Sequence, residues 1–144
     1  YFELVLLMEN NFILYPAVLL MILTLFLYVK NYLDNTTAFK NKIVKGSYFK
    51  AYQDEVPEYI EVSRQTLKSQ FELPILFYFL ICIILIFDQV MIIDHIFAWM
   101  FVISRYIHCY IRLTSNYVPY RAKAFKVGLL ILIVWWINFL VYNL

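Results

Sequence analysis

The stretch from Phe71 to Phe87 reads FELPILFYFLICIILIF. From Leu73 onward it is continuously apolar, without the alternation of polar and apolar residues that marks a barrel strand. About 20 helical residues are needed to cross a hydrocarbon core of roughly 30 Å. The stretch therefore predicts a transmembrane helix and, with it, an integral membrane protein.

Three further apolar stretches of similar length predict that the chain crosses the membrane four times. Together with 71–87, the expected spans are 11–29, 92–113 and 125–142. Of the 144 residues, 64% are hydrophobic and only 15% are charged, whereas soluble domains carry about a quarter of charged residues. A core of this size cannot bury so much apolar surface. We therefore expect an all-α, integral membrane four-helix bundle, with residues 1–144 forming a single domain.

Basic residues are confined to two regions of the chain. All 12 Lys and Arg residues lie within 30–68 or 105–126, whereas the tails and the segment 88–94 carry only acidic residues. Because Lys and Arg near span ends are retained on the cytoplasmic side, both termini are expected on the non-cytoplasmic side of a bacterial inner membrane or an organelle membrane. Those acidic residues are Glu3, Glu9, Asp88 and Asp94. The charge balance implies no nucleic-acid partner.

Two features of the loops can be predicted. Pro57 suits the first turn of a helix, and the residues after it predict one helix from Pro57 to Phe87, about 46 Å long. Its first third would project into the cytosol, and Pro74 favours a kink. The polar and aromatic segment 31–52 is expected to be an irregular or interfacial loop.

The outer ends of the spans carry aromatic residues and one carboxylate. Trp135 is expected to anchor its helix at the membrane interface, where Trp and Tyr gather. Asp94 begins the third stretch and is expected to cap that helix. Cys82 and Cys109 lie singly within apolar stretches, which indicates packing residues and no metal site.

Two groups of polar residues lie at the inner ends of the second and third stretches, where ionisable groups are costly. Each group recurs at helical spacing and so shares one helix face. On the second stretch these are Gln65, Ser69 and Glu72, flanked by Arg64 and Lys68; on the third they are Arg105, His108 and Arg112.

Both groups are expected at the same depth, because the second helix enters the membrane from the inside and the third leaves it there. Glu72 is expected to pair with an arginine, leaving surplus positive charge. Such a pocket suits a small anionic ligand, and a guanidinium can also stabilise a thiolate. The alternative interpretation is that the charged side chains form interhelical ion pairs or snorkel to the interface.

Two motifs suggest a family. Residues 64–78, RQTLKSQFELPILFY, and residues 104–116, SRYIHCYIRLTSN, followed by VPYR at 118–121, resemble signatures of the MAPEG family, membrane-associated proteins in eicosanoid and glutathione metabolism. The resemblance extends from the first span to the last and is closest to the bacterial-type branch.

The resemblance implies a homotrimer that binds glutathione between neighbouring subunits near the cytoplasmic face. Arg64 and Glu72 match the positions that hold glutathione, and Arg112 matches the arginine that activates its thiol. Ser69, Arg105 and His108 are expected as further binding residues; the last two belong to the same helix as Arg112. The implied activity is a glutathione-dependent transferase or peroxidase that acts on lipophilic substrates, with membrane lipids as its surroundings.

Some positions depart from the family pattern. Lys68 replaces an asparagine, Glu72 precedes Pro74 by two residues instead of three, and Phe101 and Arg105 occupy positions of family tyrosines. These departures leave open a non-catalytic lipid-binding protein or an accessory subunit of a larger membrane complex. A transporter is disfavoured, since the sequence shows no inverted repeat and no pair of interrupted helices.

Overall fold

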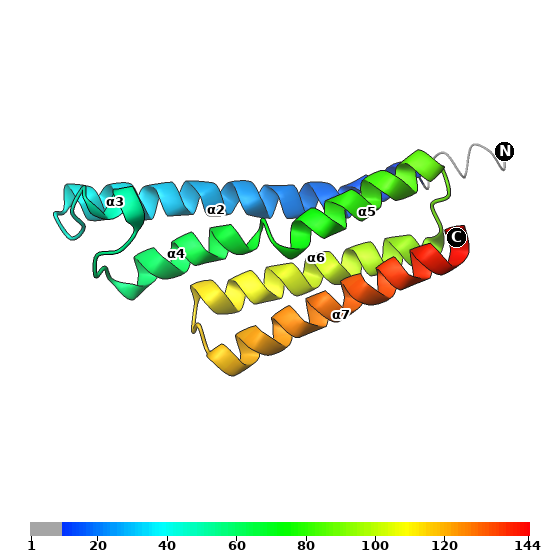
Figure 1. Cartoon of the computed structure of the whole chain (residues 1–144). Coiled ribbons are helices and arrows are strands. Elements are labelled where there is room, and N and C mark those ends of the chain that lie inside the picture. Colours follow the sequence, from blue (N-terminus) through cyan, green and yellow to red (C-terminus); the bar gives the residue numbers. More distant parts are fainter. Residues whose placement is uncertain (1–9) are drawn as a thin grey trace.

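The computed structural model describes residues 10–144, and all regular structure in that range is helical (Figure 1). The all-α prediction is therefore confirmed for this part of the chain, while Glu3 and Glu9 lie outside the described residues. The helices are α2 (Leu14–Lys40), α3 (Tyr48–Ala51), α4 (Glu58–Ser69), α5 (Leu73–Phe87), α6 (Ile92–Leu113) and α7 (Val118–Asn143).

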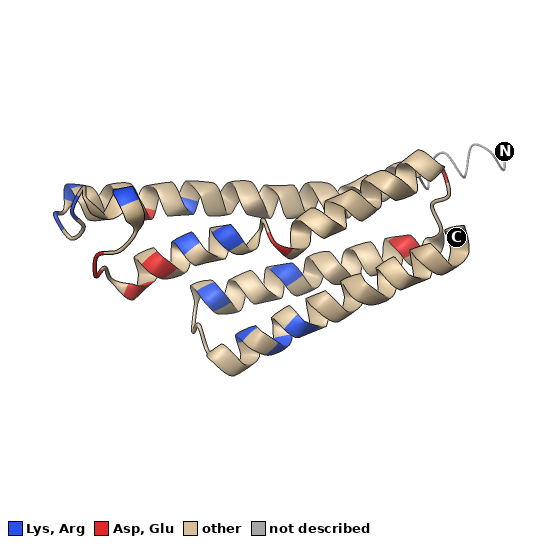
Figure 2. Ribbon diagram, viewed as in Figure 1, with Lys and Arg blue, Asp and Glu red and all other residues tan. Residues whose placement is uncertain are grey.

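The long helices run along a common direction and pack in a defined order (Figure 1). α2 contacts α4 and α6, α6 contacts α7, and α5 contacts α7. Most Lys and Arg residues lie toward the end of the molecule that holds α3 and the turn from α6 to α7, as Figure 2 shows. We call this the basic end.

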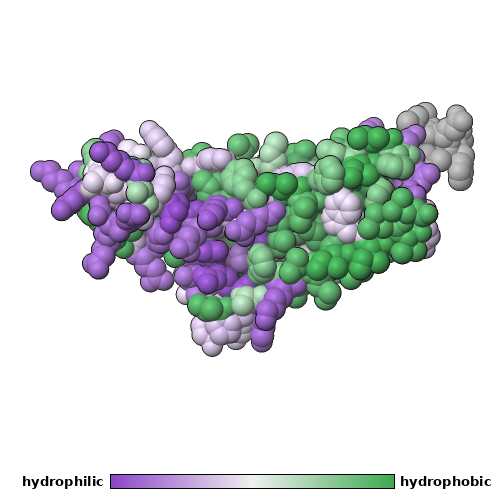
Figure 3. Space-filling view, in the orientation of Figure 1, coloured by the Kyte–Doolittle hydropathy of each residue, from purple (hydrophilic) through white to green (hydrophobic). Residues whose placement is uncertain are grey.

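Three helical stretches are long and apolar enough to cross a membrane: Asn10–Lys40, Glu58–Phe87 and Val118–Asn143. Figure 3 shows hydrophobic residues over the half of the molecule away from α3. α6 has the expected bounds and, at 22 residues, sufficient length. It also carries five acidic, basic or histidine residues, Asp94, His95, Arg105, His108 and Arg112, and its role as a fourth span stays a prediction.

Trp135 lies in the core instead of at the interface, so its prediction as an anchor is wrong. Its side chain is fully buried and lies near Phe77, which stacks on Phe101 with ring centroids 4.9 Å apart. A buried indole N–H needs an acceptor, and Trp135 Nε1 donates to Asp94 Oδ1 at 2.8 Å. Asp94 Oδ2 also accepts from the Met91 backbone N–H at 2.9 Å, so Asp94 caps α6 from inside its first turn.

The segment 31–52 is more regular than expected. α2 continues as far as Lys40, supported by an ion pair between Lys30 and Asp34 one turn apart (2.8 Å). Its last turn packs into a second small core formed by Ala38, Val44, Tyr48 and Ile60. Burial of Ala38 in that core explains why the helix extends past the apolar stretch.

The predicted continuous helix from Pro57 to Phe87 is broken. α4 ends at Ser69 and α5 begins at Leu73, while Glu72 between them has non-helical backbone angles (φ −100°, ψ −99°). Pro74 lacks an N–H, and its ring would clash with the carbonyl of the residue four positions earlier in a continuous helix. The expected kink at Pro74 is thus a full interruption, which lets α5 pack on α7 while α4 packs on α2 and α6.

We predict that a methyl group at Gly128 disturbs the contact between α6 and α7. A Cβ there would lie 2.9 Å from Ser104 Oγ, which donates to the Phe101 carbonyl at 2.6 Å. Alanine stabilises the interior of a helix relative to glycine by about 1 kcal/mol, and this gain would mask the cost of the clash. A double-mutant cycle with Ser104→Ala separates the two effects. In thermal unfolding in detergent, Gly128→Ala is expected to raise stability in a Ser104→Ala background and to lower it in the wild type. Equal effects in both backgrounds would contradict this packing.

Candidate functional site

Arg105 is the most deeply buried charged residue of the predicted site. Its side chain is 1% exposed and lies on the face of α6 that meets the end of α4. Its Nη2 donates to the Ser69 carbonyl at 3.2 Å and to Ser69 Oγ at 3.1 Å. The arginine therefore bonds the last residue of α4, where the helix is interrupted.

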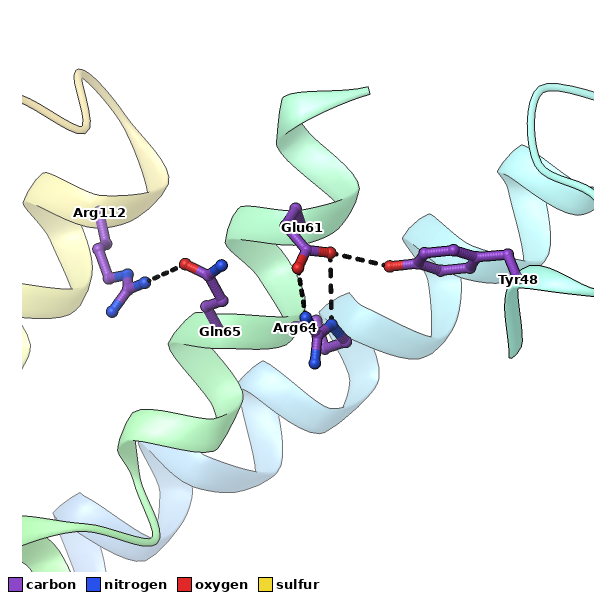
Figure 4. Close-up of polar contacts among 5 residues, drawn as sticks. All are labelled: Tyr48, Glu61, Arg64, Gln65 and Arg112. Atoms are coloured by element: carbon purple, nitrogen blue, oxygen red, sulfur yellow. Dashed lines mark hydrogen bonds and ion pairs between the residues drawn. The ribbon is translucent and has the colours of Figure 1, made fainter. Parts of the chain in front are cut away.

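His108 and Arg112 extend this cluster toward the basic end. The ring Nδ1 of the buried His108 lies 3.3 Å from the Arg121 carbonyl at the start of α7, a distance that suits donation by Nδ1–H. Arg112 Nη2 donates to Gln65 Oε1 at 2.8 Å (Figure 4). The predicted convergence of the two helices is thus present, through the pairs Ser69 with Arg105 and Gln65 with Arg112.

Several polar atoms of the cluster have no partner within residues 10–144. They are buried, and they comprise Arg105 Nε and Nη1, Arg112 Nε and His108 Nε2. Buried donors without a partner cost about 1 to 3 kcal/mol each, so native proteins satisfy them with protein groups, water or a ligand. With Nδ1 as the donor, His108 Nε2 is an acceptor. The cluster therefore offers several cationic donors and one acceptor to a bound molecule.

Arg64 lies apart from this cluster. It forms an ion pair with Glu61 one turn earlier, and its guanidinium lies 4.7 Å from the centre of the Tyr52 ring. Glu61 Oε2 also accepts from the Tyr48 hydroxyl at 2.9 Å (Figure 4). Arg64 is thus engaged by the α3 segment, on the other side of α4 from Arg112.

Glu72 does not take the expected place either. It is exposed, precedes the first residue of α5, and forms no ion pair with any of residues 10–144. Glu72 would lie on the same face as Gln65 and Ser69 only if the helix were continuous, and the helix is interrupted after Ser69. The predicted pairing of Glu72 with an arginine is therefore wrong.

Two residues that were not predicted as site residues complete the cluster. Arg121 contributes its carbonyl to His108, and its Nη1 donates to Asn116 Oδ1 at 2.8 Å. Asn116 has a positive φ of 47°, a conformation in which Asn is enriched, and its Nδ2 lies 3.4 Å from Glu58 Oε1. The asparagine in the turn after Arg112 could have been recognised in the sequence as a candidate polar residue of the cluster. The contact between Arg121 and His108 could not, because it depends on how that turn folds.

We predict that the Tyr48 hydroxyl stabilises the α3 segment. Burial, reinforced by the hydrogen bond to Glu61, raises the pKa of Tyr48 above its ordinary 10.0, so the phenol stays a donor. Tyr48→Phe should lower the free energy of unfolding by about 1.5 to 3 kcal/mol, because a hydrogen bond to a charged group is lost. This difference should shrink as the pH rises past 10.0. Tyr48 then ionises more readily in the unfolded chain than in the folded protein, which destabilises the wild type. Tyr48→Phe has no phenol at this position and escapes that loss.

Tyr52→Phe is the matched control for that measurement by chemical denaturation. It keeps the ring that lies beside Arg64 and should change stability by less than about 0.5 kcal/mol. Equal losses for both variants would show that the Tyr48 hydroxyl has no special role.

Comparison with known proteins gives one match. The model of the MAPEG family matches residues 13–141. No curated protein and no solved structure matches the chain. The family match covers α2 through α7 almost completely, including the cluster around Arg105 and Arg112. The chain belongs to the MAPEG family.

Proposed function

We propose that this protein is a glutathione-dependent transferase or peroxidase that acts on lipophilic substrates. The observation that carries the proposal is the set of buried, unpaired donors on Arg105 and Arg112, beside the unpaired acceptor of His108. Glutathione has two carboxylates and a thiol that ionises to an anion, together with amide and ammonium donors. Its chemistry is therefore complementary to this set of groups.

Each residue has a role in this proposal. Arg112 stabilises the glutathione thiolate, since a cation beside a thiol favours its ionised form. Arg105, His108 and Ser69 bind the peptide part within the cluster, and the carbonyl of Arg121 holds the His108 ring. Arg64 and Glu72 bind the ends of the tripeptide at the rim.

The proposed assembly is a homotrimer of the bacterial-type branch. Arg112 and Gln65 meet at the surface of the subunit, where Gln65 is exposed. Glu72 is also exposed and without an ion pair among residues 10–144. A neighbouring subunit that covers these residues would complete the pocket, with glutathione between the two chains.

We further propose that α6 is the fourth membrane span and that both chain termini lie on the non-cytoplasmic side. The clustering of Lys and Arg at the basic end supports this orientation (Figure 2). Three charged or histidine residues of α6 are buried and so face protein neighbours: Asp94, Arg105 and His108. Inward-facing charges are the arrangement that membrane helices tolerate.

A second candidate function is a non-catalytic lipid-binding protein or an accessory subunit of a larger membrane complex. Two observations favour it: Arg64 is already paired with Glu61, and Phe101 stacks on Phe77, offering no hydroxyl to a ligand. In that case Arg105 and Arg112 would bind lipid phosphates or a partner.

We predict that the purified protein converts bound glutathione to its thiolate. Adding millimolar glutathione should produce the ultraviolet absorbance band of a thiolate, and Arg112→Ala should abolish it because the stabilising cation is lost. Lys123→Ala is the matched control, since Lys123 lies on α7 near the ring of Tyr120, and it should keep the band.

The alternatives give different results in the same experiment. If wild-type protein shows no thiolate band at millimolar glutathione, the transferase proposal fails. Copurification of the chain with a different membrane protein, in the absence of that band, would support the accessory subunit.

A further inference from the structure

The first turns of α7 carry positive charge that no nearby carboxylate balances. Arg121, Lys123 and Lys126 lie close together there, at the basic end (Figure 2). The chain contains no Asp or Glu after Asp94, and neither lysine forms an ion pair with any of residues 10–144. The two amines are therefore available to an anion from outside the chain.

The two lysines lie where a membrane helix meets lipid headgroups. The stretch Val118–Asn143 is long and apolar enough to cross a membrane, and its uninterrupted apolar part begins directly after Lys126. A lysine at the end of such a part keeps its alkyl stem in apolar surroundings and extends its amine toward the interface. Lys123 and Lys126 thus present their amines at the depth of phospholipid phosphates.

Lys123, unlike Lys126, also lines a cavity of about 340 Å³ between α6 and α7. The other lining residues are Ser104, Ile107 and Ile111 of α6, and Tyr120, Ala124 and Val127 of α7. Lys123 Nζ lies 5.9 Å from the centre of the Tyr120 ring. Ile107 and Val127 are 50% and 52% exposed, so these walls face outward and are apolar. The cavity therefore combines one unpaired cation with a hydrophobic surface.

We propose that this cavity is a binding site for an anionic phospholipid of the surrounding membrane. A phosphate oxygen accepts a hydrogen bond from the Lys123 amine, and one acyl chain lies against Ile107 and Val127. A phospholipid joins an anion and a hydrocarbon chain in one molecule, which is the combination that this cavity offers. The inference is independent of the proposed glutathione chemistry, which uses none of these residues.

The surrounding charge favours an anionic lipid over a zwitterionic one. Phosphatidylcholine has the same phosphate, but its ammonium group would approach the cations of Arg121 and Lys126, and like charges repel. Arg121 Nη1 donates to Asn116 Oδ1, a neutral group that leaves the charge of the guanidinium uncompensated. Phosphatidylglycerol has no ammonium group and avoids this repulsion.

The test is native mass spectrometry of the full chain in detergent micelles, titrated with dioleoyl phosphatidylglycerol or dioleoyl phosphatidylcholine. The two lipids have the same acyl chains, so they differ only in the headgroup. The measured quantity is the dissociation constant of the first lipid bound per chain. Phosphatidylglycerol should bind about tenfold more tightly, since each basic residue near an anionic headgroup contributes about 1 kcal/mol.

Two lysine variants separate a defined site from general surface charge. Lys123→Ala should weaken phosphatidylglycerol binding by about tenfold, because a hydrogen bond between charged groups is lost, and Lys123→Arg should retain most of the affinity. Lys126→Ala is the matched control. It removes the same charge from an exposed position outside the cavity and should weaken binding by about twofold or less, because salt screens the more distant charge.

A second pair of variants tests the acyl-chain part of the cavity. Val127→Trp fills it from a half-exposed position and should weaken phosphatidylglycerol binding by about tenfold, because the chain loses its apolar contact. Leu130→Trp is its control, since Leu130 is 62% exposed on α7 and does not line the cavity. It should leave the dissociation constant unchanged.

Four results would each overturn the proposal. These are equal binding of the two lipids, equal weakening by Lys123→Ala and Lys126→Ala, an unchanged dissociation constant in Val127→Trp, and displacement of phosphatidylglycerol by equimolar oleate. The second result would indicate attraction to general surface charge, and the fourth would identify the occupant as a single-chain fatty acid. All four substituted positions are exposed, so the variants leave the buried core intact.

Discussion

The contact between Arg105 and Ser69 is the interaction on which the rest of the structure depends. Burying a charge away from water is costly unless it is hydrogen-bonded, and Arg105 is 1% exposed, so its guanidinium needs acceptors. The end of a helix leaves carbonyl groups without intrahelical partners, and α4 ends at Ser69. Arg105 Nη2 donates to both the carbonyl and the hydroxyl of Ser69. The guanidinium thus gains acceptors, and the carbonyl at the end of the helix gains a donor.

The interrupted helix then determines where the other functional groups lie. α4 packs on α2 and α6, which brings Gln65 to Arg112 and Gln70 to Cys109. α5 packs on α7 instead, and Glu72 in the interruption is left exposed. The buried end of α4 and the C-terminal half of α6 therefore form one polar cluster, which includes Arg105 and the surroundings of the Cys109 thiol.

The sequence was sufficient for features that follow from periodicity and composition. Long apolar runs predicted the helices, and the spacing of Arg105, His108 and Arg112 predicted their common face. It was insufficient where tertiary contacts compete with local pattern. Trp135 looked like an interfacial residue, but Asp94 offers a buried acceptor to its indole. The ion pair of Arg64 with Glu61 and its contact with the α3 segment could not be predicted either, because that segment is held by a small core whose residues show no helical periodicity in the sequence.

The most direct test of this account is the backbone carbon-13 chemical shifts of the protein in lipid, measured by NMR for the wild type and for Arg105→Met. Helical Cα shifts are expected through α4 and α5, with a non-helical Cα shift at Glu72, whose backbone angles depart from the helix. The carbonyl shift of Ser69 should change in the variant, whereas that of Val62, within α4, should not. Helical shifts that continue through Glu72, or a Ser69 carbonyl unaffected by loss of the guanidinium, would contradict it.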